Sequence, residues 1–255
     1  MIELDKLAKT FHQKDGTEVR AVDAVSLAVP RGEICVFLGP SGCGKTTTLK
    51  MINRLIEPTS GTVRIDGEDT AGLDGVTLRR KIGYVIQQIG LFPHYTVADN
   101  IATVPKLLKW EKAKIDARVD ELLTLVALEP KEFRDRYPAQ LSGGQQQRVG
   151  LARALAVDPK IMLMDEPFGA VDSITREKLQ DELVRLHRET GKTFLFVTHD
   201  IEEAFKLGDR VLIMNEGTIR QFDTPEATIR HPADPFVASL VNSAKAKEAF
   251  WREYL

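Results

Sequence analysis

The sequence predicts an α/β fold with a buried parallel sheet, on three observations. The runs Ile34–Leu38, Ile161–Met164 and Thr193–Val197 are short and apolar or rich in β-formers, as strands buried on both faces are. Residues 97–127 instead repeat their apolar residues at helical spacing, with charges between them. A glycine-rich loop, Gly39–Thr47, lies between the first run and a helix-like segment. Strand, glycine-rich loop and helix in this order are typical of phosphate-binding proteins.

The composition narrows the class of protein. At 255 residues the chain is long enough for one large domain or two small ones. Its formal net charge of −2 gives no overall preference for nucleic acid or an anionic membrane. No apolar run approaches the roughly 18 residues that span a bilayer, and residues 1–5 lack the charge pattern of a signal peptide. Cys35 and Cys43 are expected to be reduced thiols, so we expect a cytosolic protein.

The glycine-rich loop is predicted to bind the phosphates of a nucleotide. Its glycines let successive backbone N–H groups turn toward a phosphate, and the following helix adds unpaired N–H donors. Lys45 supplies charge for the β- and γ-phosphates, and Thr46 a hydroxyl for Mg²⁺. A turn that binds nothing is the alternative, but the pattern arises by chance in about one chain in a hundred of this length. The loop consists of Gly39, Pro40, Ser41, Gly42, Cys43, Gly44, Lys45, Thr46 and Thr47.

Residues 1–30 alternate apolar and polar side chains on either side of Asp15-Gly16, which predicts two antiparallel strands joined by a turn. Phe11 lies in the first of them among polar neighbours. Taken alone, it is equally a core residue of an edge strand and a flat surface for a purine ring. Aromatic stacking contributes about 1–3 kcal/mol per base. Given the phosphate loop, we favour the adenine platform.

The middle of the chain is predicted to continue with a helix, Thr46–Ile56, and two strands, Thr62–Ile65 and Ile82–Ile86. Gln87-Gln88 closes the second strand. The Gln87 amide can bond water or metal, but without context an ordinary polar strand end is the better interpretation. The helical region at 97–127 is predicted to be an insert whose apolar stripes form its own core or receive a partner helix.

Leu141–Gln145 opens a second helix on glycines, so its backbone donors also favour an anion. By physical argument alone, a helix cap is the more probable use of these residues. The exact five-residue sequence, however, occurs by chance in about a few chains of this length in ten thousand.

Two acids follow the buried run Ile161–Met164, where carboxylates are costly unless they meet a cation or a reaction. Asp165 is predicted to hold Mg²⁺, and Glu166 to orient and deprotonate an attacking water, a role worth about 10²–10⁴-fold in rate. His199 ends the run Thr193–Val197, parallel to the strand that carries Glu166. That shared strand end favours contact with a γ-phosphate over a structural role.

The C-terminal part is predicted to form a hairpin, Val211–Met214 with Thr218–Phe222, and a short helix that starts at Pro225. Residues 236–255 are amphipathic through Phe236, Leu240, Phe250, Trp251 and Tyr254, and we expect them to pack on the domain rather than on a membrane.

Together these motifs resemble the ATP-binding cassette ATPases, the motor subunits of ABC transporters, over residues 2–241. Leu141–Gln145 is similar to the family signature, Gly39–Thr46 to the Walker A loop and Ile161–Asp165 to the Walker B strand. The remaining matches are Glu166 as catalytic glutamate, Gln87 as Q-loop, Asp172 as D-loop, His199 as switch histidine and Phe11 as adenine-stacking residue.

The resemblance implies a P-loop NTPase fold over residues 1–242. A RecA-like core with an antiparallel β subdomain would occupy residues 1–90 and 159–242, a helical subdomain residues 91–158, and a tail residues 243–255. Lys45 and Gln87 would join Glu166 and His199 in catalysis. Mg²⁺ would be held by Thr46, Gln87 and Asp165. ATP would contact Phe11, the Walker A loop, Asp172, Ser142, Gly143, Gly144 and Gln145.

The family also implies partners. Ser142 and Gly144 would contact the γ-phosphate of ATP bound to a second copy of the chain, so that two copies close head to tail and separate after hydrolysis. Gln87 and the helical insert would pass this motion to a membrane permease. An extracytoplasmic solute-binding protein would act indirectly, no nucleic acid is expected, and the chain would lie at the cytoplasmic face of the inner membrane.

Within the family, three stretches of the chain are similar in sequence to importers of glycine betaine, choline and carnitine. They are Met51–Gly61, Ile82–Val97 and Asp165–Val171. Many such subunits add C-terminal CBS domains that sense ionic strength; this sequence ends before them, so we do not expect it to regulate itself osmotically. Val171 and Ser173 replace commoner residues, with little effect expected. Three alternatives remain: a cassette for another solute such as amino acids, a non-transport cassette acting on ribosomes or DNA, and a non-catalytic nucleotide sensor.

Overall fold

The computed structural model describes residues 1–87, 90–169 and 171–254, with side chains up to residue 245. The chain forms two compact units, Met1–Leu73 with Leu195–Leu255 and Asp74–Phe194. Gln88, Ala170 and the side chains of Phe250, Trp251 and Tyr254 lie outside the described residues, so the predictions that involve them stay predictions.

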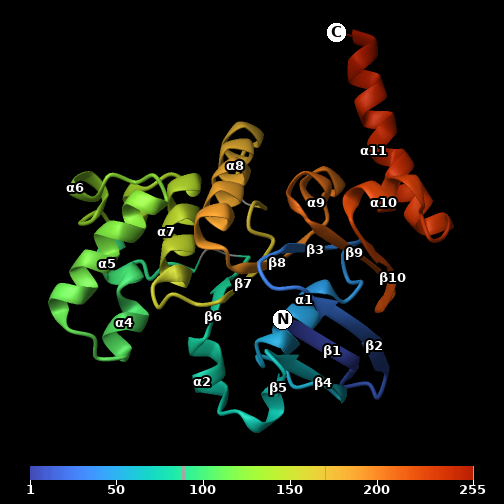
Figure 1. Ribbon diagram of the computed structural model, residues 1–255, viewed down its shortest axis with the longest axis horizontal. Coiled ribbons are helices and arrows are strands. Elements are labelled where there is room, and N and C mark those ends of the chain that lie inside the picture. The colour runs from blue at the N-terminus through green and yellow to red at the C-terminus, as the bar shows by residue number, and fades with distance from the viewer. Residues whose placement is uncertain (88–89, 170, 255) are drawn as a thin grey trace. The chain divides into compact units, whose positions relative to one another are not determined.

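The first unit contains an antiparallel sheet with the strand order β2-β1-β4-β5 (Figure 1). Ile2 and Leu4 alternate into the core from β1, and an irregularity in the strand between Leu4 and Leu7 brings Leu7 into the core as well. The predicted pairing of the first two strands is confirmed, with Ile2 opposite Val29 and register shifts further along. The strands are β1 (Ile2–His12), β2 (Glu18–Val29), β4 (Ser60–Ile65) and β5 (Glu68–Asp69).

The first unit also holds strands in the order β10-β9-β3-β8, with β3 and β9 parallel and β9 and β10 forming the predicted hairpin. All five residues of β3 are buried, as expected for a strand covered on both faces. These strands are β3 (Ile34–Leu38), β8 (Thr193–Thr198, divided between the units), β9 (Arg210–Asn215) and β10 (Thr218–Asp223). The helices are α1 (Lys45–Ile52), α9 (Ile201–Leu207), α10 (Pro225–Arg230) and α11 (Pro235–Tyr254), with a 3-10 turn at Thr70–Gly72.

The predicted helix Thr46–Ile56 is wrong at its C-terminal end, because α1 stops at Ile52. The cause is Arg54, which has a left-handed φ of 46°. Its guanidinium donates to the backbone oxygens of Thr70 and Leu73 at 2.8 and 2.6 Å. A contact between residues distant in sequence therefore ends this helix.

The second unit pairs β6 (Ile82–Val85) with β7 (Ile161–Asp165) in parallel, in the order β8-β7-β6. Five helices follow β6 before β7 begins, which confirms the helical character predicted for residues 97–127. They are α3 (Val97–Ile101), α4 (Thr103–Leu107), α5 (Lys112–Leu125), α6 (Pro130–Phe133) and α7 (Gly143–Leu155). The unit also contains α2 (Gly75–Arg80), a 3-10 turn at Pro138–Gln140, and α8 (Ser173–Thr190).

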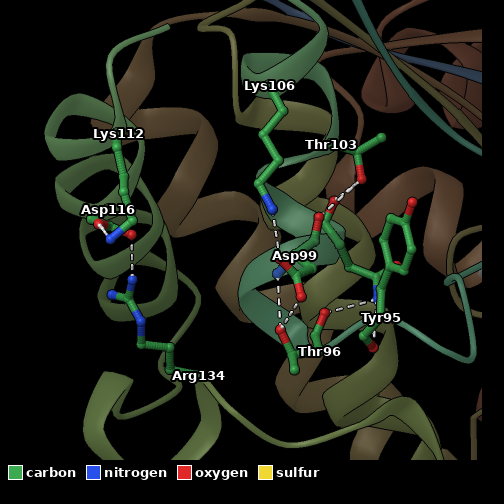
Figure 2. A network of polar contacts seen from close by, with 9 residues as sticks. Tyr95, Thr96, Asp99, Thr103, Lys106, Lys112, Asp116 and Arg134 are labelled. Carbon is green, nitrogen blue, oxygen red and sulfur yellow. Dashed lines mark hydrogen bonds and ion pairs between the residues drawn. The ribbon is translucent and has the colours of Figure 1, made fainter. Parts of the chain in front are cut away.

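Polar contacts link residues of the helices between β6 and β7 (Figure 2). The Thr96 hydroxyl caps α3 by accepting from the Asp99 N–H, and Lys106 pairs with Asp99 at 2.6 Å. Arg134 pairs with Asp116 of α5 at 2.6 Å. Such exposed pairs are each worth under about 1 kcal/mol, so the buried apolar faces contribute most of the stability here.

Among the described residues, none of the helices combines the length and the apolar character needed to cross a membrane.

Candidate functional site

The glycine-rich loop joins β3 to α1 with a backbone that only glycine permits at two points. Gly39 has a φ of 155°, and a Cβ there would lie 2.2 Å from the Met214 carbonyl oxygen. Gly44 has a φ of 103°, and a Cβ there would lie 2.4 Å from the Ala21 carbonyl oxygen. Neighbouring strands therefore press on the loop and set its path, so any side chain at these positions would displace it.

Lys45 turns back into this loop. It is only 5% exposed, and its ammonium donates to the carbonyl oxygens of Gly39 and Pro40 at 2.6 and 2.9 Å. The Cys43 sulfur lies 3.7 Å from the same nitrogen. The fold therefore holds a buried cation at the centre of the loop, where it can exchange carbonyl partners for phosphate oxygens.

The N-terminus of α1 is open to an anion, because its N-cap is Gly44 and no side chain caps it. Uncapped N–H groups at a helix start favour a phosphate. Thr46 and Thr47 lie half-buried in this first turn, whereas Pro40, Ser41 and Gly42 are exposed. Both cysteines are free and buried, as predicted, and burial raises the pKa of the Cys35 thiol, which stays protonated.

Phe11 lies on β1, where 38% of its surface is exposed. The ammonium of Lys9, on the same face of the strand, lies 5.2 Å from the centre of its ring and donates to the Glu57 carbonyl oxygen at 2.7 Å. Sequence reasoning missed Lys9, although the two-residue spacing places it beside Phe11. The exposed ring can receive a base, and Lys9 adds positive charge over one of its faces.

His199 follows β8 directly and is exposed. Its neighbours hold the strand end in place. Asp200 caps α9 by accepting from the N–H groups of Glu202 and Glu203, and the Thr198 hydroxyl donates to Glu203 at 2.6 Å. The imidazole therefore stands on a rigid strand-to-helix corner, where a side chain is well placed to meet a ligand.

Gln87 and Glu166 meet at the carboxyl ends of two parallel strands. Because β6 and β7 pair in parallel, with Val85 beside Met164, residues that follow them share one sheet edge. The Gln87 amide donates to a Glu166 carboxylate oxygen at 2.9 Å. Glu166 takes a left-handed φ of 47°, and its carbonyl accepts from the Gly169 N–H. Strained conformations of this kind are found at functional sites, and here the strained residue carries the carboxylate that Gln87 contacts.

Asp165 is the last residue of β7 and only 3% exposed. A carboxylate in such surroundings is suited to a cation, and carboxylate and hydroxyl oxygens are the ligands that Mg²⁺ takes. Residues with the right donor atoms for Mg²⁺ are therefore present at Thr46, Gln87 and Asp165.

The predicted signature residues start α7. The Ser142 hydroxyl accepts from the Gln145 N–H at 3.3 Å, while the Ser142 N–H donates to the Gln145 side chain at 2.9 Å. This reciprocal cap agrees with the helix-cap interpretation and leaves anion binding open as a second use. Gly143 is exposed, but Gly144 is buried.

Asp172 caps α8 by accepting from the Thr175 N–H at 3.0 Å. That backbone bond, and a second one from the Thr175 side chain, lower the pKa of Asp172 below its usual range. The carboxylate is therefore charged at neutral pH and is fixed at the start of the helix.

The structure thus brings Gln87 to Glu166, Lys45 to its own loop and Ser142 to Gln145. Phe11 and His199 stand on separate elements, β1 and the end of β8. The chain thus supplies backbone N–H groups for phosphate, a buried cation, buried or tethered carboxylates and an exposed ring. These are the groups needed to bind a nucleoside triphosphate and to activate water.

Known proteins are similar to this chain over most of its length. A family profile described as "ABC transporter" matches residues 22–169. The osmoprotectant import ATP-binding protein OsmV of Salmonella typhimurium is 56% identical over 94% of this chain and 63% of its own length. The glycine betaine/carnitine/choline transport ATP-binding protein OpuCA of Bacillus subtilis is 54% identical over 96% and 63%. A spermidine/putrescine import ATP-binding protein, PotA of Thermobifida fusca, is 47% identical over 95% and 62%.

The chain therefore spans less than two thirds of the length of these relatives. Among solved structures, a dimeric post-hydrolysis state of the ATP-binding cassette MJ0796, bound to ADP and Pi, superposes with a TM-score of 0.78 at 39% identity. It covers 88% of this chain and 99% of the cassette. The α/β cassette fold predicted from the sequence is confirmed, and the chain belongs to the ABC transporter family.

Proposed function

We propose that this chain is the ATP-hydrolysing subunit of an importer of quaternary-amine osmoprotectants such as glycine betaine, choline and carnitine. The observation that carries the proposal is the ranking of its relatives. Proteins named for osmoprotectants or glycine betaine are 52–56% identical to it, whereas one named for polyamines is 47% identical. The higher identity to the osmoprotectant subunits favours the same class of solute for this chain.

The proposed chemistry is the hydrolysis of ATP to ADP and phosphate. Phe11 stacks on adenine, the loop from Gly39 to Thr47 binds the phosphates, and Lys45 pairs with the β- and γ-phosphates. Glu166 accepts a proton from the attacking water, Gln87 orients the Glu166 carboxylate, and His199 binds the γ-phosphate. Mg²⁺, held by Thr46, Gln87 and Asp165, would offset phosphate charge. Asp172, Ser142, Gly143, Gly144 and Gln145 complete the nucleotide contacts.

We further propose that two copies close head to tail around ATP, with Ser142 and Gly144 of one copy on the γ-phosphate bound by the other. The domain boundaries belong to this proposal: a nucleotide-binding domain at 1–242, with a helical subdomain at 91–158, and a tail at 243–255. The backbone of α11 runs through the boundary at 242 as one helix.

The permease is proposed to contact the second unit at a groove of about 480 Å³. Phe92 and Leu107 line it and are 47% and 69% exposed. Three arginines, Arg79, Arg80 and Arg153, also line it. An apolar groove lined by positively charged arginines suits an amphipathic helix that carries acidic side chains. We therefore propose such a helix from the permease as its occupant. The subunit would then act at the cytoplasmic face of the membrane, with the solute-binding protein a partner only through the permease.

The proposal is tested with Glu166→Gln, which keeps the hydrogen bond to Gln87 but cannot accept a proton. We expect ATP hydrolysis with Mg²⁺ to fall by at least about 10²-fold. Glu121→Gln, the same change on the exposed face of α5, is the matched control and should hydrolyse ATP at the wild-type rate.

The same variant tests the pairing of two copies. Because it binds ATP without consuming it, it should run as a dimer in size-exclusion chromatography with saturating Mg-ATP and as a monomer without nucleotide. Steady hydrolysis by Glu166→Gln would contradict the assigned base. A variant that stays monomeric would contradict the head-to-tail dimer.

A further inference from the structure

Gly144 is buried against the start of α8, and this contact leaves no space for a side chain. A Cβ at Gly144 would lie 2.6 Å from the Thr175 methyl carbon, whereas ordinary contacts begin at 3.4 Å. The next nearest atom is the Leu179 methyl carbon, at 3.9 Å. Thr175 is β-branched, so its methyl carbon is held close to the backbone and cannot swing aside as a long side chain can.

The contact is the first of several along one seam between α7 and α8. One turn after Gly144, Arg148 pairs with Glu182 of α8 at 2.7 Å, and both side chains are at least three-quarters buried. The apolar side chains of Leu151, Leu179 and Leu183 line a cavity on the same seam. The two helices are thus packed over several turns, and Gly144 can withdraw from Thr175 only if this whole seam shifts.

Thr175 also holds the start of its own helix. Its N–H donates to the Asp172 carboxylate at 3.0 Å, so its backbone is tied to the residue assigned as D-loop. Its side chain contacts Gly144, which lies within the capped turn formed by Ser142 and Gln145. One residue therefore connects two segments that the proposed function assigns to nucleotide binding.

We infer that Thr175 is a positioning residue that determines how closely Gly144 packs against α8. It thereby fixes the position of Ser142 relative to Asp172 within one chain. This inference rests on the proposed function for its catalytic consequence, but the contact itself does not depend on it. A glycine is then needed at position 144 for two reasons: a side chain would collide with Thr175, and it would crowd the proposed γ-phosphate. A displacement of about 1 Å at such a site costs about 10²-fold in rate.

Compensation tests the inference. Gly144→Ala should lower the kcat of ATP hydrolysis by about 10²-fold, because the added methyl group pushes the signature turn off α8. Thr175→Ser removes the opposing methyl group and keeps the N–H bond to Asp172. We therefore expect the double variant Gly144→Ala/Thr175→Ser to recover to within about tenfold of Thr175→Ser alone. Thr175→Val keeps a branched side chain but loses the hydroxyl bond to Asp172, so Gly144→Ala/Thr175→Val should stay impaired relative to Thr175→Val alone.

Thermal unfolding of the same variants separates the contact from its consequence. Gly144→Ala should lower Tm, and Thr175→Ser should restore it in the double variant. Gly72→Ala is the control for a glycine-to-alanine change, since a Cβ there has nothing within 4 Å.

Recovery of both Tm and kcat supports the inference. Recovery of Tm without kcat would overturn the positioning role, and recovery of neither would overturn the contact as well. A wild-type chain without ATPase activity would contradict the proposed function, while the contact between Gly144 and Thr175 would still be decided by the unfolding data.

Discussion

Phe11 and Lys9 illustrate what single residues add to the site. The ring of Phe11 is partly exposed on β1, and the Lys9 ammonium approaches its face without covering all of it. The ring needs no hydrogen-bond partner, so stacking on a base is the contribution that we propose for it. Lys45 is the opposite case, because its buried ammonium already uses two carbonyl oxygens and must exchange them on binding.

At the scale of a residue, we predict that Phe11→Ala weakens ATP binding by about 1–3 kcal/mol, or about 5- to 150-fold in Kd. Phe11→Trp should bind ATP at least as well as the wild type, because its larger ring stacks on the same base. The measurement is titration calorimetry with Mg-ATP at fixed salt.

Val19→Ala is the matched control, since Val19 pairs with Phe11 across the sheet and is 41% exposed. It should leave the Kd unchanged. Equal affinities of the wild type and Phe11→Ala would exclude the adenine platform and return Phe11 to an edge-strand role.

At the scale of elements, the loop before α3 depends on one buried amide. Asn100 is fully buried, and its side chain accepts from the Phe92 N–H at 2.8 Å. The same side chain donates to the carbonyl oxygens of Phe92, Tyr95 and Thr96 at 3.0–3.2 Å. One residue of α3 thus contacts four backbone groups, with its two N–H hydrogens shared among three carbonyl oxygens, and this holds the loop against the helix. The rings of Phe92 and Tyr95, 5.2 Å apart, are presented on its outer side.

We therefore predict that Asn100→Ala lowers the free energy of unfolding by about 2–3 kcal/mol, because it leaves buried backbone groups without partners. Urea unfolding at neutral pH measures this. Because Phe92 lines the proposed permease groove, stimulation of the ATPase by the permease should fall further than the basal rate does.

Asn242→Ala, an exposed change of the same kind on α11, should leave both quantities unchanged. Asn100→Asp keeps the acceptor but replaces the donor with a carboxylate facing three carbonyl oxygens, and it should be at least as unstable as Asn100→Ala. An Asn100→Ala variant as stable as the wild type would show that the loop does not need this amide.

At the scale of the whole molecule, the function is inferred from family membership more than from any one contact. Cassettes for other solutes are also similar to this chain, since a spermidine/putrescine import ATP-binding protein is 47% identical to it. Under the proposed function the solute is bound by other subunits, so this chain would act on it only through the permease. Hydrolysis can therefore report the solute only when the whole transporter is present.

We predict that the chain, reconstituted with its permease and binding protein, hydrolyses ATP faster when glycine betaine, choline or carnitine is added. Phosphate release in proteoliposomes measures this, and spermidine is the matched cationic control that should have no effect. Stimulation by spermidine or by sugars alone would exclude the proposed solutes and leave the ATPase assignment intact.

The strand and helix assignments show how far local signals reach. The buried runs at β3, β7 and β8 and the hairpin β9–β10 were predictable, because each is an uninterrupted apolar or alternating segment. The helix α2 was missed, since Gly75–Arg80 is short and carries few apolar residues. The end of α1 was misplaced, because the Arg54 guanidinium donates to the carbonyl oxygens of Thr70 and Leu73, which lie 16 and 19 residues further along the chain.

The sequence by itself determined the nucleotide loop, the paired acids after β7 and the family, because these depend on residue types at fixed short spacings. Only the tertiary structure decided that Gln87 meets Glu166, that Lys9 lies on Phe11, and that Gly144 but not Gly143 is buried. The physical reason is that packing joins residues tens of positions apart, and no periodicity within a segment records which distant side chain will occupy the space beside it.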